Sequence, residues 1–493
     1  MPRSKTSLAA IVLAAGKGTR MKSARAKVLH ELCGRPLAWY PVKRALDAGA
    51  EPVAVVVGHQ AEAVEAALAA SLPGAPIRFA VQAKQLGTAN AVLAAKNALR
   101  GWKGHVAIVS GDTPLLETET IRRVVAARSR ARASLAFATM TLEAPRGYGR
   151  VLRDPAGKPA RVVEEKDATA EQREVREVNA GLYCVEAAFL WKALARVGTR
   201  NAQQEFYLPD LVEIAAGSGG AVAVPVEPAQ ASGVNDREEL ARAAKVLLQR
   251  HASALMRSGV TIEDPGRFDC DEGVEIGPDT VVEPGVRLLG KTRIGSGCRI
   301  GAGAVLRDVA LGDGVTILPY VVANDSSVAA KAIVGPFSRL RPGSEIGEEA
   351  HIGNFVETKK SRIGRGAKAN HLAYLGDAFV GAKANVGAGT ITCNYDGEKK
   401  HQTRIGDGAF IGSDSILVAP IEIGDGAYVA AGSVLTDPVP PGALALGRAR
   451  QVTKEGWVEK RRAEKQMKER EGEGGKPAPT SPGKARAPAR QAG

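Results

Sequence analysis

A glycine-containing segment near the N-terminus has the residue types of a phosphate-binding turn. Its two glycines let the backbone turn tightly and bring N–H groups against phosphate oxygens, while Lys17 and Arg20 add positive charge. The segment is Leu13-Ala14-Ala15-Gly16-Lys17-Gly18-Thr19-Arg20-Met21. It lacks the Gly-Lys-Ser/Thr ending of a P-loop, and Met21 stands where a dinucleotide-binding fingerprint has its third glycine. Taken alone, an ordinary loop between a strand and a helix explains it equally well.

More polar residues follow at the ends of apolar runs. Lys27 comes soon after the turn, and Asp112 directly follows an apolar run in the segment Gly111-Asp112-Thr113-Pro114. Between them lie Gln82 and the segment Gln85-Leu86-Gly87-Thr88. An aspartate before Thr-Pro can also have a purely structural role in a turn, so Asp112 by itself leaves both interpretations open.

Polar residues that packing does not require also interrupt the C-terminal half. They lie in four segments: Arg339-Leu340-Arg341-Pro342-Gly343, Gly353-Asn354-Phe355-Val356-Glu357-Thr358-Lys359-Lys360, Asn370-His371-Leu372-Ala373-Tyr374-Leu375-Gly376-Asp377 and a longer run from Asn385 to Lys400. A lone histidine in such a region usually has a structural role. The last segment has the composition of an inserted polar loop.

The N-terminal half alternates between strand and helix patterns. We expect strands at Ile11–Ala15, Val53–Val57, Ile77–Val81 and Val106–Ser110, and helices at Pro36–Ala48, Ala61–Ala70 and Ala89–Leu99. Continuous apolar strands separated by helices predict a mainly parallel, Rossmann-like α/β sheet. Ligands bind such sheets beyond the carboxyl ends of the strands, where the polar residues of the first two groups fall.

The C-terminal half carries an aliphatic residue at every sixth position from about Ile276 to Leu435. The series includes Ile276, Val282, Leu288, Ile294, Ile300 and Leu306, then Val328, Val334, Leu340, Ile346 and Ile352, then Ile405, Ile411, Leu417, Ile423, Val429 and Leu435. This period is the hexapeptide signature of a left-handed parallel β-helix, in which each repeat forms a short strand and a corner. Three faces per coil make about eighteen residues per turn, which predicts eight or nine coils in this stretch.

The sequence divides into four parts. We expect an α/β domain over residues 1–235, a helix over 236–257 with Asp236 as its N-cap, a β-helix domain over 258–450 and a tail over 451–493. The helix would act as a rigid spacer between the two domains. The tail from about Gly472 has the composition of a disordered segment.

Composition narrows the possible classes of protein. The chain of 493 residues has a formal net charge of +14, and residues 451–493 carry 11 lysines and arginines against 6 glutamates. Anionic small-molecule substrates explain the remaining charge as well as nucleic acid does, and no basic run interleaved with aromatic residues favours nucleic acid. Five scattered cysteines argue against a disulfide framework and for a cytoplasmic protein. The apolar run from Leu8 to Ala15 is too short to span a membrane.

The N-terminal motifs resemble those of the nucleotidyltransferase (sugar-nucleotide pyrophosphorylase) family. Tyr148-Gly149-Arg150, Val163-Glu164-Glu165-Lys166-Asp167, Asn179-Ala180-Gly181 and Gly233-Val234-Asn235 continue the pattern in the expected order. The resemblance implies transfer of a nucleoside monophosphate to a sugar 1-phosphate. It implies that Leu13 and the amides of Gly16 and Gly18 hold the nucleotide, and that Arg20 and Lys27 neutralise charge at the α-phosphate.

The same resemblance implies the remaining roles in this site. Gln82, Gly87 and Thr88 would face the base, Gly149, Glu164, Asn179 and Asn235 would hold the sugar phosphate, and Asp112 and Asn235 would bind Mg²⁺ through oxygen. Ser110 replaces the tyrosine that more often precedes Gly-Asp, and Ala180 replaces the threonine of Asn-Thr-Gly. Both departures lie on the sugar side of the site, where they bear on which acceptor it selects.

The C-terminal segments resemble the acetyltransferase half of the bifunctional N-acetylglucosamine-1-phosphate uridylyltransferase/glucosamine-1-phosphate N-acetyltransferase family. The resemblance extends over about residues 8–457 and includes the closing Gln451-Val-Thr-Lys-Glu-Gly-Trp457. It implies acetyl transfer from acetyl-CoA to the amine of glucosamine 1-phosphate, with neutral His371 as the general base. The implied sugar-phosphate residues are Arg341, Lys359, Tyr374, Asn385 and Lys400. The implied acetyl-CoA residues are Ala388, Asn394, Tyr395, Ser413, Ala431 and Arg448.

The resemblance also implies that acetylation precedes uridylyl transfer from UTP, that the product feeds peptidoglycan and lipopolysaccharide synthesis, and that the protein is a homotrimer with no nucleic-acid or membrane partner. Two alternatives remain at this point. The first is a pyrophosphorylase whose β-helix only assembles oligomers, which predicts no role for His371. The second is a non-enzymatic subunit like those of translation-factor exchange complexes, against which the presence of Lys27, Asp112 and Asn235 argues.

Overall fold

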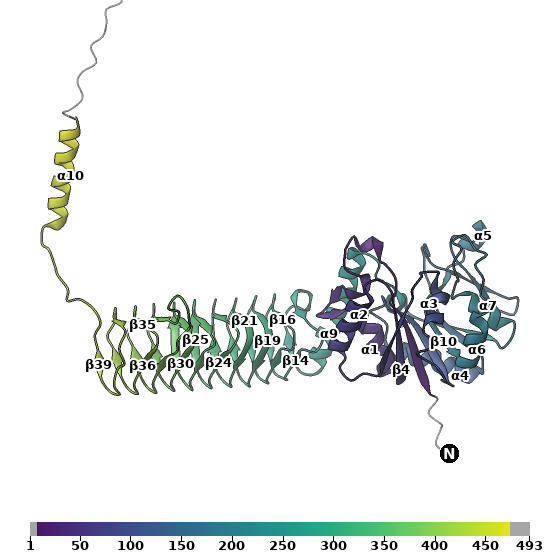
Figure 1. The fold of residues 1–493 in the computed structure, drawn as a ribbon, viewed down its shortest axis with the longest axis horizontal. Helices are drawn as coiled ribbons and strands as arrows, with labels where there is room; N and C mark the ends of the chain where they lie inside the picture. The colour runs from purple at the N-terminus through teal and green to yellow at the C-terminus, as the bar shows by residue number, and fades with distance from the viewer. Residues whose placement is uncertain (1–6, 474–493) are drawn as a thin grey trace, which may run out of the picture. The chain divides into compact units, whose positions relative to one another are not determined.

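The computed structural model describes residues 7–473, and backbone contacts divide the chain into two compact units, Met1–Leu446 and Gly447–Gly493. The first unit contains an α/β sheet domain followed by a solenoid (Figure 1). In the second unit the described residues form one helix, α10 (Trp457–Glu473). The predicted disordered segment lies outside the described residues, apart from the end of this helix. No helix within residues 7–473 has both the length and the apolar character needed to cross a bilayer.

The N-terminal sheet has the strand order β11-β7-β10-β6-β1-β4-β5, with the β8–β9 hairpin attached to β10. Its strands are β1 (Leu8–Leu13), β4 (Ala50–Val57), β5 (Ile77–Val81), β6 (His105–Ser110), β7 (Leu135–Thr141), β8 (Arg150–Arg153), β9 (Pro159–Val163), β10 (Glu177–Glu186) and β11 (Ala221–Pro225). Strands β1, β4, β5 and β6 pair in parallel, β7 pairs in parallel with β11, and β10 runs antiparallel to both β6 and β7. The predicted mainly parallel sheet is therefore confirmed.

Helices connect these strands, and two buried clusters form the cores on the two faces of the sheet. The helices are α1 (Trp39–Asp47), α2 (Ala61–Ser71), α3 (Thr88–Ala94), α4 (Thr118–Ala131), α5 (Ala170–Arg173), α6 (Ala187–Leu194), α7 (Asp210–Ala216), α8 (Pro228–Ala231) and α9 (Arg237–Arg257). Short elements complete the domain: the 3-10 turns Thr19–Met21 and Lys27–Leu29 and the small hairpin β2 (Glu31–Leu32) and β3 (Arg35–Pro36).

Several predicted boundaries were wrong, among them the start of the first helix, which lies at Trp39 rather than Pro36 because Pro36 belongs to the small hairpin. Two others have clear local reasons. The first strand ends at Leu13 rather than Ala15, because Ala15 already belongs to the loop after the strand. The third helix ends at Ala94 rather than Leu99, because the hydrogen bonds after it change to the shorter i→i−3 type, as in Lys96 N–H to the Leu93 carbonyl at 3.0 Å.

Helix α9 begins at the predicted N-cap, since the Asp236 side chain accepts a hydrogen bond from the Glu239 N–H at 2.8 Å. It is more than a spacer. Its Ala243 and Leu247 belong to the core of the α/β domain, whereas Ala252 belongs to the core of the solenoid. The helix is therefore held by apolar packing at both ends.

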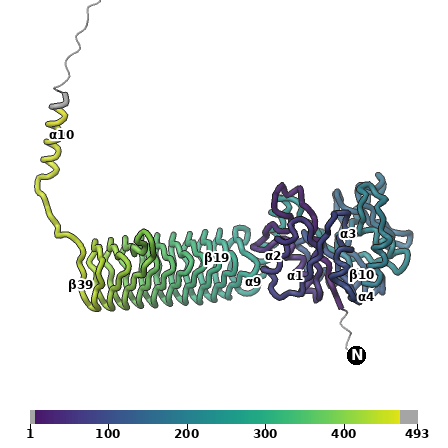
Figure 2. The backbone as a smooth tube through the Cα atoms, viewed as in Figure 1, coloured from purple at the N-terminus to yellow at the C-terminus, as the bar shows by residue number. Residues whose placement is uncertain are grey.

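The solenoid is the expected left-handed parallel β-helix, with its coils stacked side by side (Figures 1 and 2). One face is an eleven-stranded parallel sheet of β12 (Thr261–Ile262), β15 (Val281–Val282), β18 (Arg299–Ile300), β20 (Thr316–Ile317), β22 (Ile333–Val334), β25 (His351–Asn354), β28 (Lys368–His371), β31 (Asn385–Val386), β34 (Phe410–Ile411), β37 (Tyr428–Val429) and β39 (Leu444–Ala445). The 3-10 turn Pro265–Arg267 lies in the first coil. Because the strands begin at Thr261 and end at Ala445, the solenoid extends beyond the eight or nine coils expected between Ile276 and Leu435.

The other two faces belong to one seventeen-stranded sheet, because β19 and β21 each run through both of them. Its strands are β13 (Asp269–Cys270), β14 (Glu275–Ile276), β16 (Arg287–Leu289), β17 (Arg293–Ile294), β19 (Val305–Leu311), β21 (Val322–Val328), β23 (Arg339–Leu340), β24 (Ser344–Ile346), β26 (Glu357–Lys359), β27 (Arg362–Ile363), β29 (Tyr374–Gly376), β30 (Ala378–Val380), β32 (Ile391–Cys393), β33 (Thr403–Ile405), β35 (Ile416–Val418), β36 (Ile421–Ile423) and β38 (Val434–Leu435). The three predicted faces per coil are thus present.

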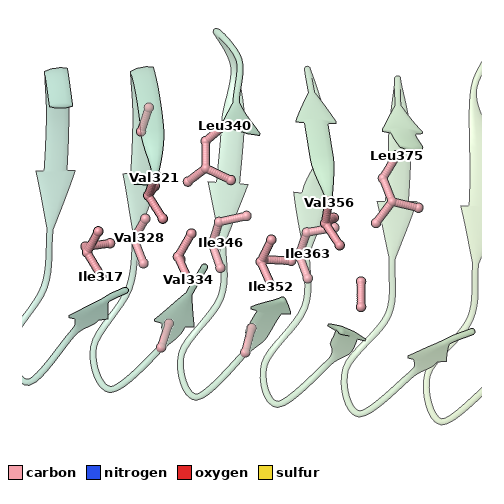
Figure 3. Close-up of a cluster of buried hydrophobic side chains, with 14 of the residues drawn as sticks. Ile317, Val321, Val328, Val334, Leu340, Ile346, Ile352, Val356, Ile363 and Leu375 are labelled. Carbon is pink, nitrogen blue, oxygen red and sulfur yellow. The ribbon is translucent and has the colours of Figure 1, made fainter. Parts of the chain in front are cut away.

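The predicted aliphatic residues point inward from successive coils and form continuous columns (Figure 3). Val334 and Ile352 from the predicted series, and Ile317, which was not in it, are paired in register on neighbouring strands and are at most 1% exposed. Burying each such side chain contributes about 1.5–3 kcal/mol. The column therefore fixes the register of the coils, and with it the positions of the polar residues at their corners.

Coil length varies along the solenoid. Paired residues on the eleven-stranded face are 18 apart in Val281 and Arg299 but 17 apart in Arg299 and Thr316. The interval from Asn385 to its partner Phe410 is 25 residues, because this coil contains the predicted polar insertion. Figure 2 shows this insertion as a loop that stands out from the otherwise even coils.

Candidate active sites

The sheet edge at the carboxyl ends of β1 and β6 borders a cleft of about 260 Å³. The residues that line it are Leu13, Ala15, Gly16, Lys27, Val28, Gln82, Gln85, Gly87, Thr88, Ala91, Ser110, Asp112 and Glu205. Seven of the predicted nucleotide and metal residues are therefore brought together from segments far apart in the sequence. Glu205 was not predicted, because no motif surrounds it.

Lys27 forms the centre of a small polar network in this cleft. Its ammonium contacts Asp112 Oδ2 and donates to Asn235 Oδ1 at 3.2 Å. The side chains of Lys27 and Asp112 are only 12% and 20% exposed, so the ion pair is partly shielded from water. Two oxygen ligands that already hold a cation are suited in type to Mg²⁺.

Gly18 gives Lys27 the space that it needs. Gly18 has a φ of 63°, and a Cβ added there would overlap with the Cβ of Lys27. Gly16 has no such constraint, since a Cβ there would meet nothing within 4 Å. Arg20 lies in the turn Thr19–Met21, where it is exposed and is not among the residues that line the cleft.

The residues predicted to face the base have structural contacts of their own. Gln82 donates through Nε2 to Asn90 Oδ1 at 2.9 Å, which orients its amide. Thr88 Oγ1 accepts from the Leu208 N–H at 2.9 Å and so ties α3 to the segment that follows Phe206. Gly87 has a φ of 108° and packs against the backbone of that segment. Asn90 was missed because it lies inside a helix without a motif.

The predicted sugar residues form a second group on β8 to β10. The Asn179 N–H donates to the Gly149 carbonyl at 2.9 Å, and a Cβ on Gly149 would lie 3.1 Å from Glu164 Oε1. Burial raises the pKa of Glu164, and the Asp167 and Asp210 carboxylates raise it further. The pairing of β10 with β7 shifts register between Asn179 and Tyr183, an irregularity often found beside functional sites.

The two departures from the family pattern lie close together. Ser110 and Ala180 both line a small enclosed cavity, together with Gly181. Ser110 also lines the cleft, so this position forms the wall between the cleft and the interior.

A second site surrounds one corner of the solenoid. His371 ends β28, Leu372 turns the corner with a φ of 44°, and Tyr374 begins β29. Asn354, on the preceding coil, is the register partner of His371. The Nδ1 atom of His371 lies 2.8 Å from Asn354 Oδ1. The imidazole is exposed at the surface. Asn354 was present in the motif but received no role from sequence reasoning.

Three cationic side chains gather on the adjoining face. The Lys400 ammonium lowers the pKa of Lys359, with smaller contributions from desolvation and Arg341 and an opposing one from Asp377. Arg341 forms an ion pair with Glu357, with Nη1 and Oε1 2.9 Å apart. The predicted phosphate-binding residues of this site thus lie close enough to repel one another, as expected for a site that binds a dianion.

The inserted loop adds polar groups to the same region. Asn394 is 7% exposed and donates to Asp377 Oδ2 at 2.5 Å, while the Tyr374 hydroxyl packs over Gly376 next to Asn394. Tyr395 is 60% exposed. The Asp396 carboxylate accepts from the N–H groups of residues 398 and 399 and from His401, and these bonds hold its pKa far below the usual range.

The predicted acetyl-CoA residues follow one corner of successive coils. The Asp414 N–H donates to the Ala388 carbonyl at 2.7 Å, and the Gly432 N–H donates to the Ser413 carbonyl at 2.8 Å. Ala431 precedes Gly432, so Ala388, Ser413 and Ala431 form a row along the solenoid. Asn385 lies on β31, next to His371's strand. Arg448 belongs to the second compact unit.

Comparisons with known proteins match both halves of the chain. Residues 10–180 match the MobA-like NTP transferase domain, residues 273–308 match the bacterial transferase hexapeptide (six repeats), and residues 402–437 match the hexapeptide repeat of succinyl-transferase. These matches agree with the sheet domain and the β-helix described above.

Full-length relatives cover the whole architecture. A bifunctional protein GlmU from Anaeromyxobacter sp. (strain Fw109-5) is 74% identical over 468 residues, which cover 95% of this chain and 96% of the relative. Proteins of the same name from Sorangium cellulosum and Geobacter sulfurreducens are 52% and 47% identical, covering 93% and 92% of this chain and 97% and 99% of the relatives. The chain therefore belongs to the family of bifunctional GlmU proteins.

Proposed function

We propose that this protein makes UDP-N-acetylglucosamine in two steps, each in its own site. The β-helix transfers an acetyl group from acetyl-CoA to the amine of glucosamine 1-phosphate, and the α/β domain then transfers UMP from UTP to the N-acetylglucosamine 1-phosphate. The observation that carries this proposal is the presence of two separate charged sites in one chain: the Lys27–Asp112–Asn235 network and the histidine and cation cluster of the solenoid corner.

The uridylyl step needs alignment of two polyanions more than covalent help. A phosphate oxygen of the sugar phosphate attacks the α-phosphorus of UTP, and pyrophosphate leaves. Lys27 and Arg20 neutralise charge that develops at the α-phosphate, and the amides of Gly16 and Gly18 donate to phosphate oxygens. Gly149, Glu164 and Asn179 hold the sugar.

Magnesium fits the donor set of this cleft. Asp112 and Asn235 would hold it, and because no group of three or more metal-ligating side chains occurs in the described part of the chain, substrate phosphates would supply further oxygen ligands. When bound, the ion neutralises phosphate charge. Lys27, which contacts both residues, would then be available to the substrate.

The acetyl step needs a base, because an ammonium cannot attack a thioester. His371 accepts a proton from the ammonium, and the freed lone pair attacks the acetyl carbonyl carbon. The sulfur of coenzyme A leaves and takes up the proton that His371 holds, while the new amide nitrogen releases its second proton to solvent. Arg341, Lys359 and Lys400 hold the sugar phosphate, and Ser413 polarises the thioester carbonyl. Tyr374, Asn385, Asn394 and Tyr395 complete the pocket, and Ala388, Ala431 and Arg448 contact coenzyme A.

The assembly and location of the protein are also proposals. The repeat solenoid supports a homotrimer in which neighbouring solenoids complete each acetyl site. The substrates are small intracellular metabolites, which supports a cytoplasmic location, and the product serves cell-wall and lipopolysaccharide synthesis.

A coupled assay with UTP, acetyl-CoA, glucosamine 1-phosphate and Mg²⁺ tests the function. UDP-N-acetylglucosamine should form only when all three substrates are present, and omission of UTP should leave N-acetylglucosamine 1-phosphate. Supplying N-acetylglucosamine 1-phosphate directly should release pyrophosphate without acetyl-CoA. If glucosamine 1-phosphate is never acetylated while pyrophosphate is still released, the acetyltransferase half of the proposal is wrong.

A further inference from the structure

His371 has one hydrogen-bond partner within the described residues, the side chain of Asn354. The two residues are paired directly on β25 and β28, and the Leu372 N–H donates to the Asn354 carbonyl at 3.0 Å. Both the ring and the corner that follows it are therefore anchored to the same residue. The 2.8 Å contact reaches the Nδ1 atom of the ring and leaves Nε2 without a partner in this part of the structure.

This contact determines which ring nitrogen can accept a proton. An amide oxygen only accepts hydrogen bonds, so a neutral imidazole bonded to it must carry its hydrogen on Nδ1. The lone pair then lies on Nε2, on the side away from Asn354. A base with its lone pair on Nδ1 would point back at the protein and could not reach a substrate.

The hydrogen-bond partner of His371 is an uncharged amide, and the charged groups near the ring show why this matters. Two titratable groups lie on the strands at this position: His351 on β25 and Lys368 on β28 itself. The strand on the other side, β31, consists of the uncharged residues Asn385 and Val386. Burial lowers the pKa of His351, and Lys368 and His371 lower it further. A carboxylate in place of Asn354 would favour the protonated ring before the substrate arrives, whereas an amide orients the ring without adding charge.

We propose that Asn354 is a positioning residue for acetyl transfer: its Oδ1 fixes the Nδ1–H tautomer of His371 and aims Nε2 at the substrate amine. In the step that it serves, Nε2 takes one proton from the C2 ammonium. The nitrogen lone pair forms the N–C bond to the acetyl carbonyl carbon, and the C–S bond breaks. The protonated Nε2 gives its proton to the leaving sulfur of coenzyme A, and the new amide nitrogen releases its second proton to solvent. This inference rests on the acetyltransferase activity proposed above.

The test compares Asn354→Ala and Asn354→Asp with the wild type and with Asn324→Ala, a half-buried solenoid asparagine two coils away that has no assigned role. Asn354→Ala should lower kcat for acetylation by about ten- to a hundredfold, the size of effect found when a hydrogen-bond partner that orients a metal-bound histidine is lost. Its KM for glucosamine 1-phosphate and its uridylyl rate should stay within twofold of the wild type, as should all values for Asn324→Ala.

Asn354→Asp tests whether residue 354 orients His371 or only supports the local fold. Aspartate keeps the acceptor and therefore the tautomer, so kcat at its optimum should stay within a few-fold of the wild type. The acidic limb of the pH–rate profile should move to higher pH by about one unit, because the carboxylate stabilises the protonated ring.

The outcomes are distinct from those for the proposed function. A wild-type protein that does not acetylate, or a fully active His371→Ala variant, would refute the acetyltransferase proposal itself. With His371 essential, an Asn354→Ala variant within twofold of wild-type kcat would overturn the role of Asn354. So would an Asn354→Asp variant with an unmoved pH profile, which remains decisive even if Asn354→Ala fails to fold.

Discussion

The two sites arrange their charges in opposite ways before any substrate arrives. In the α/β cleft, the Lys27 ammonium is already neutralised by Asp112 and bonded to Asn235. At the solenoid corner, Lys359 lies beside Lys400 and close to Arg341, and the repulsion lowers the pKa of Lys359. The first site holds a compensated ion pair, whereas the second gathers three positive charges, which suits the phosphate dianion proposed above.

The sites also differ in how the fold assembles them. The residues of the cleft lie far apart in the sequence, from Leu13 to Glu205, and different strands, helices and loops bring them together. Residues of the corner repeat at coil intervals, so that a single stacking register aligns Asn354 with His371. A substitution in the cleft should therefore affect only the contacts of that residue. At the corner, a change in coil length would shift the register and move several site residues together.

The largest effects are expected from removing one central group from each site. Asp112→Ala takes away a predicted metal ligand and leaves Lys27 without its carboxylate, so uridylyl transfer should fall by at least about a hundredfold. His371→Ala removes the predicted base, so acetyl transfer should fall by about a hundred- to ten-thousandfold. Separate assays of the two activities in both variants measure this. Loss of both activities in either variant would contradict two independent sites.

A smaller effect should follow from reducing the positive charge of the solenoid corner. Lys359→Met removes a charged hydrogen-bond donor for the sugar phosphate. The KM of acetylation for glucosamine 1-phosphate should therefore rise by roughly ten- to a hundredfold. Lys360→Met is the matched control, because this lysine is adjacent but exposed and outside the cation cluster. An equal rise in both variants would mean that general charge, and not this cluster, attracts the substrate.

The sequence was sufficient for the fold, because its signals are local and repeated. The six-residue period specified the solenoid, and the break in phase before Ile405 located the insertion that makes one coil 25 residues long. The ends of the strands were predicted less accurately than their existence. The first strand was placed too far toward Ala15, since an apolar run continues into the loop after Leu13.

The site was predictable only where motifs mark it. The pairing of Asn354 with His371 was out of reach, because it depends on the exact coil length at that point. An eighteen-residue coil would place Gly353 beside His371, whereas the actual seventeen-residue coil places Asn354 there. Glu205 reaches the cleft, and Asn90 reaches the Gln82 amide, through packing that no spacing reveals. The roles assigned to individual site residues stay predictions.

A more modest loss of uridylyl transfer is expected when Gly18, whose missing side chain leaves room for Lys27, is replaced. Gly18→Ala places a Cβ in a left-handed conformation, which costs about 1–2 kcal/mol, and pushes against Lys27. We expect the α/β domain to melt a few degrees lower and uridylyl transfer to fall about tenfold as Lys27 is displaced. Gly16→Ala, where the added Cβ meets nothing within 4 Å, should leave the melting temperature unchanged. Equal melting shifts in the two variants would contradict this role for Gly18.

The smallest effect concerns the pH dependence of the charge cluster at the corner. Because Lys400 lowers the pKa of Lys359, Lys359 loses its proton at a lower pH than the ordinary lysine value of about 10.4. The sugar phosphate favours the charged form, so the KM of acetylation for glucosamine 1-phosphate should rise as the pH increases through the pKa of the free enzyme. Lys400→Met removes the repulsion and should move this rise to higher pH, even though the loss of one cation weakens binding at neutral pH. KM measured across alkaline pH in both proteins tests this, and a rise at the same pH in both would show that Lys400 does not control the charge of Lys359.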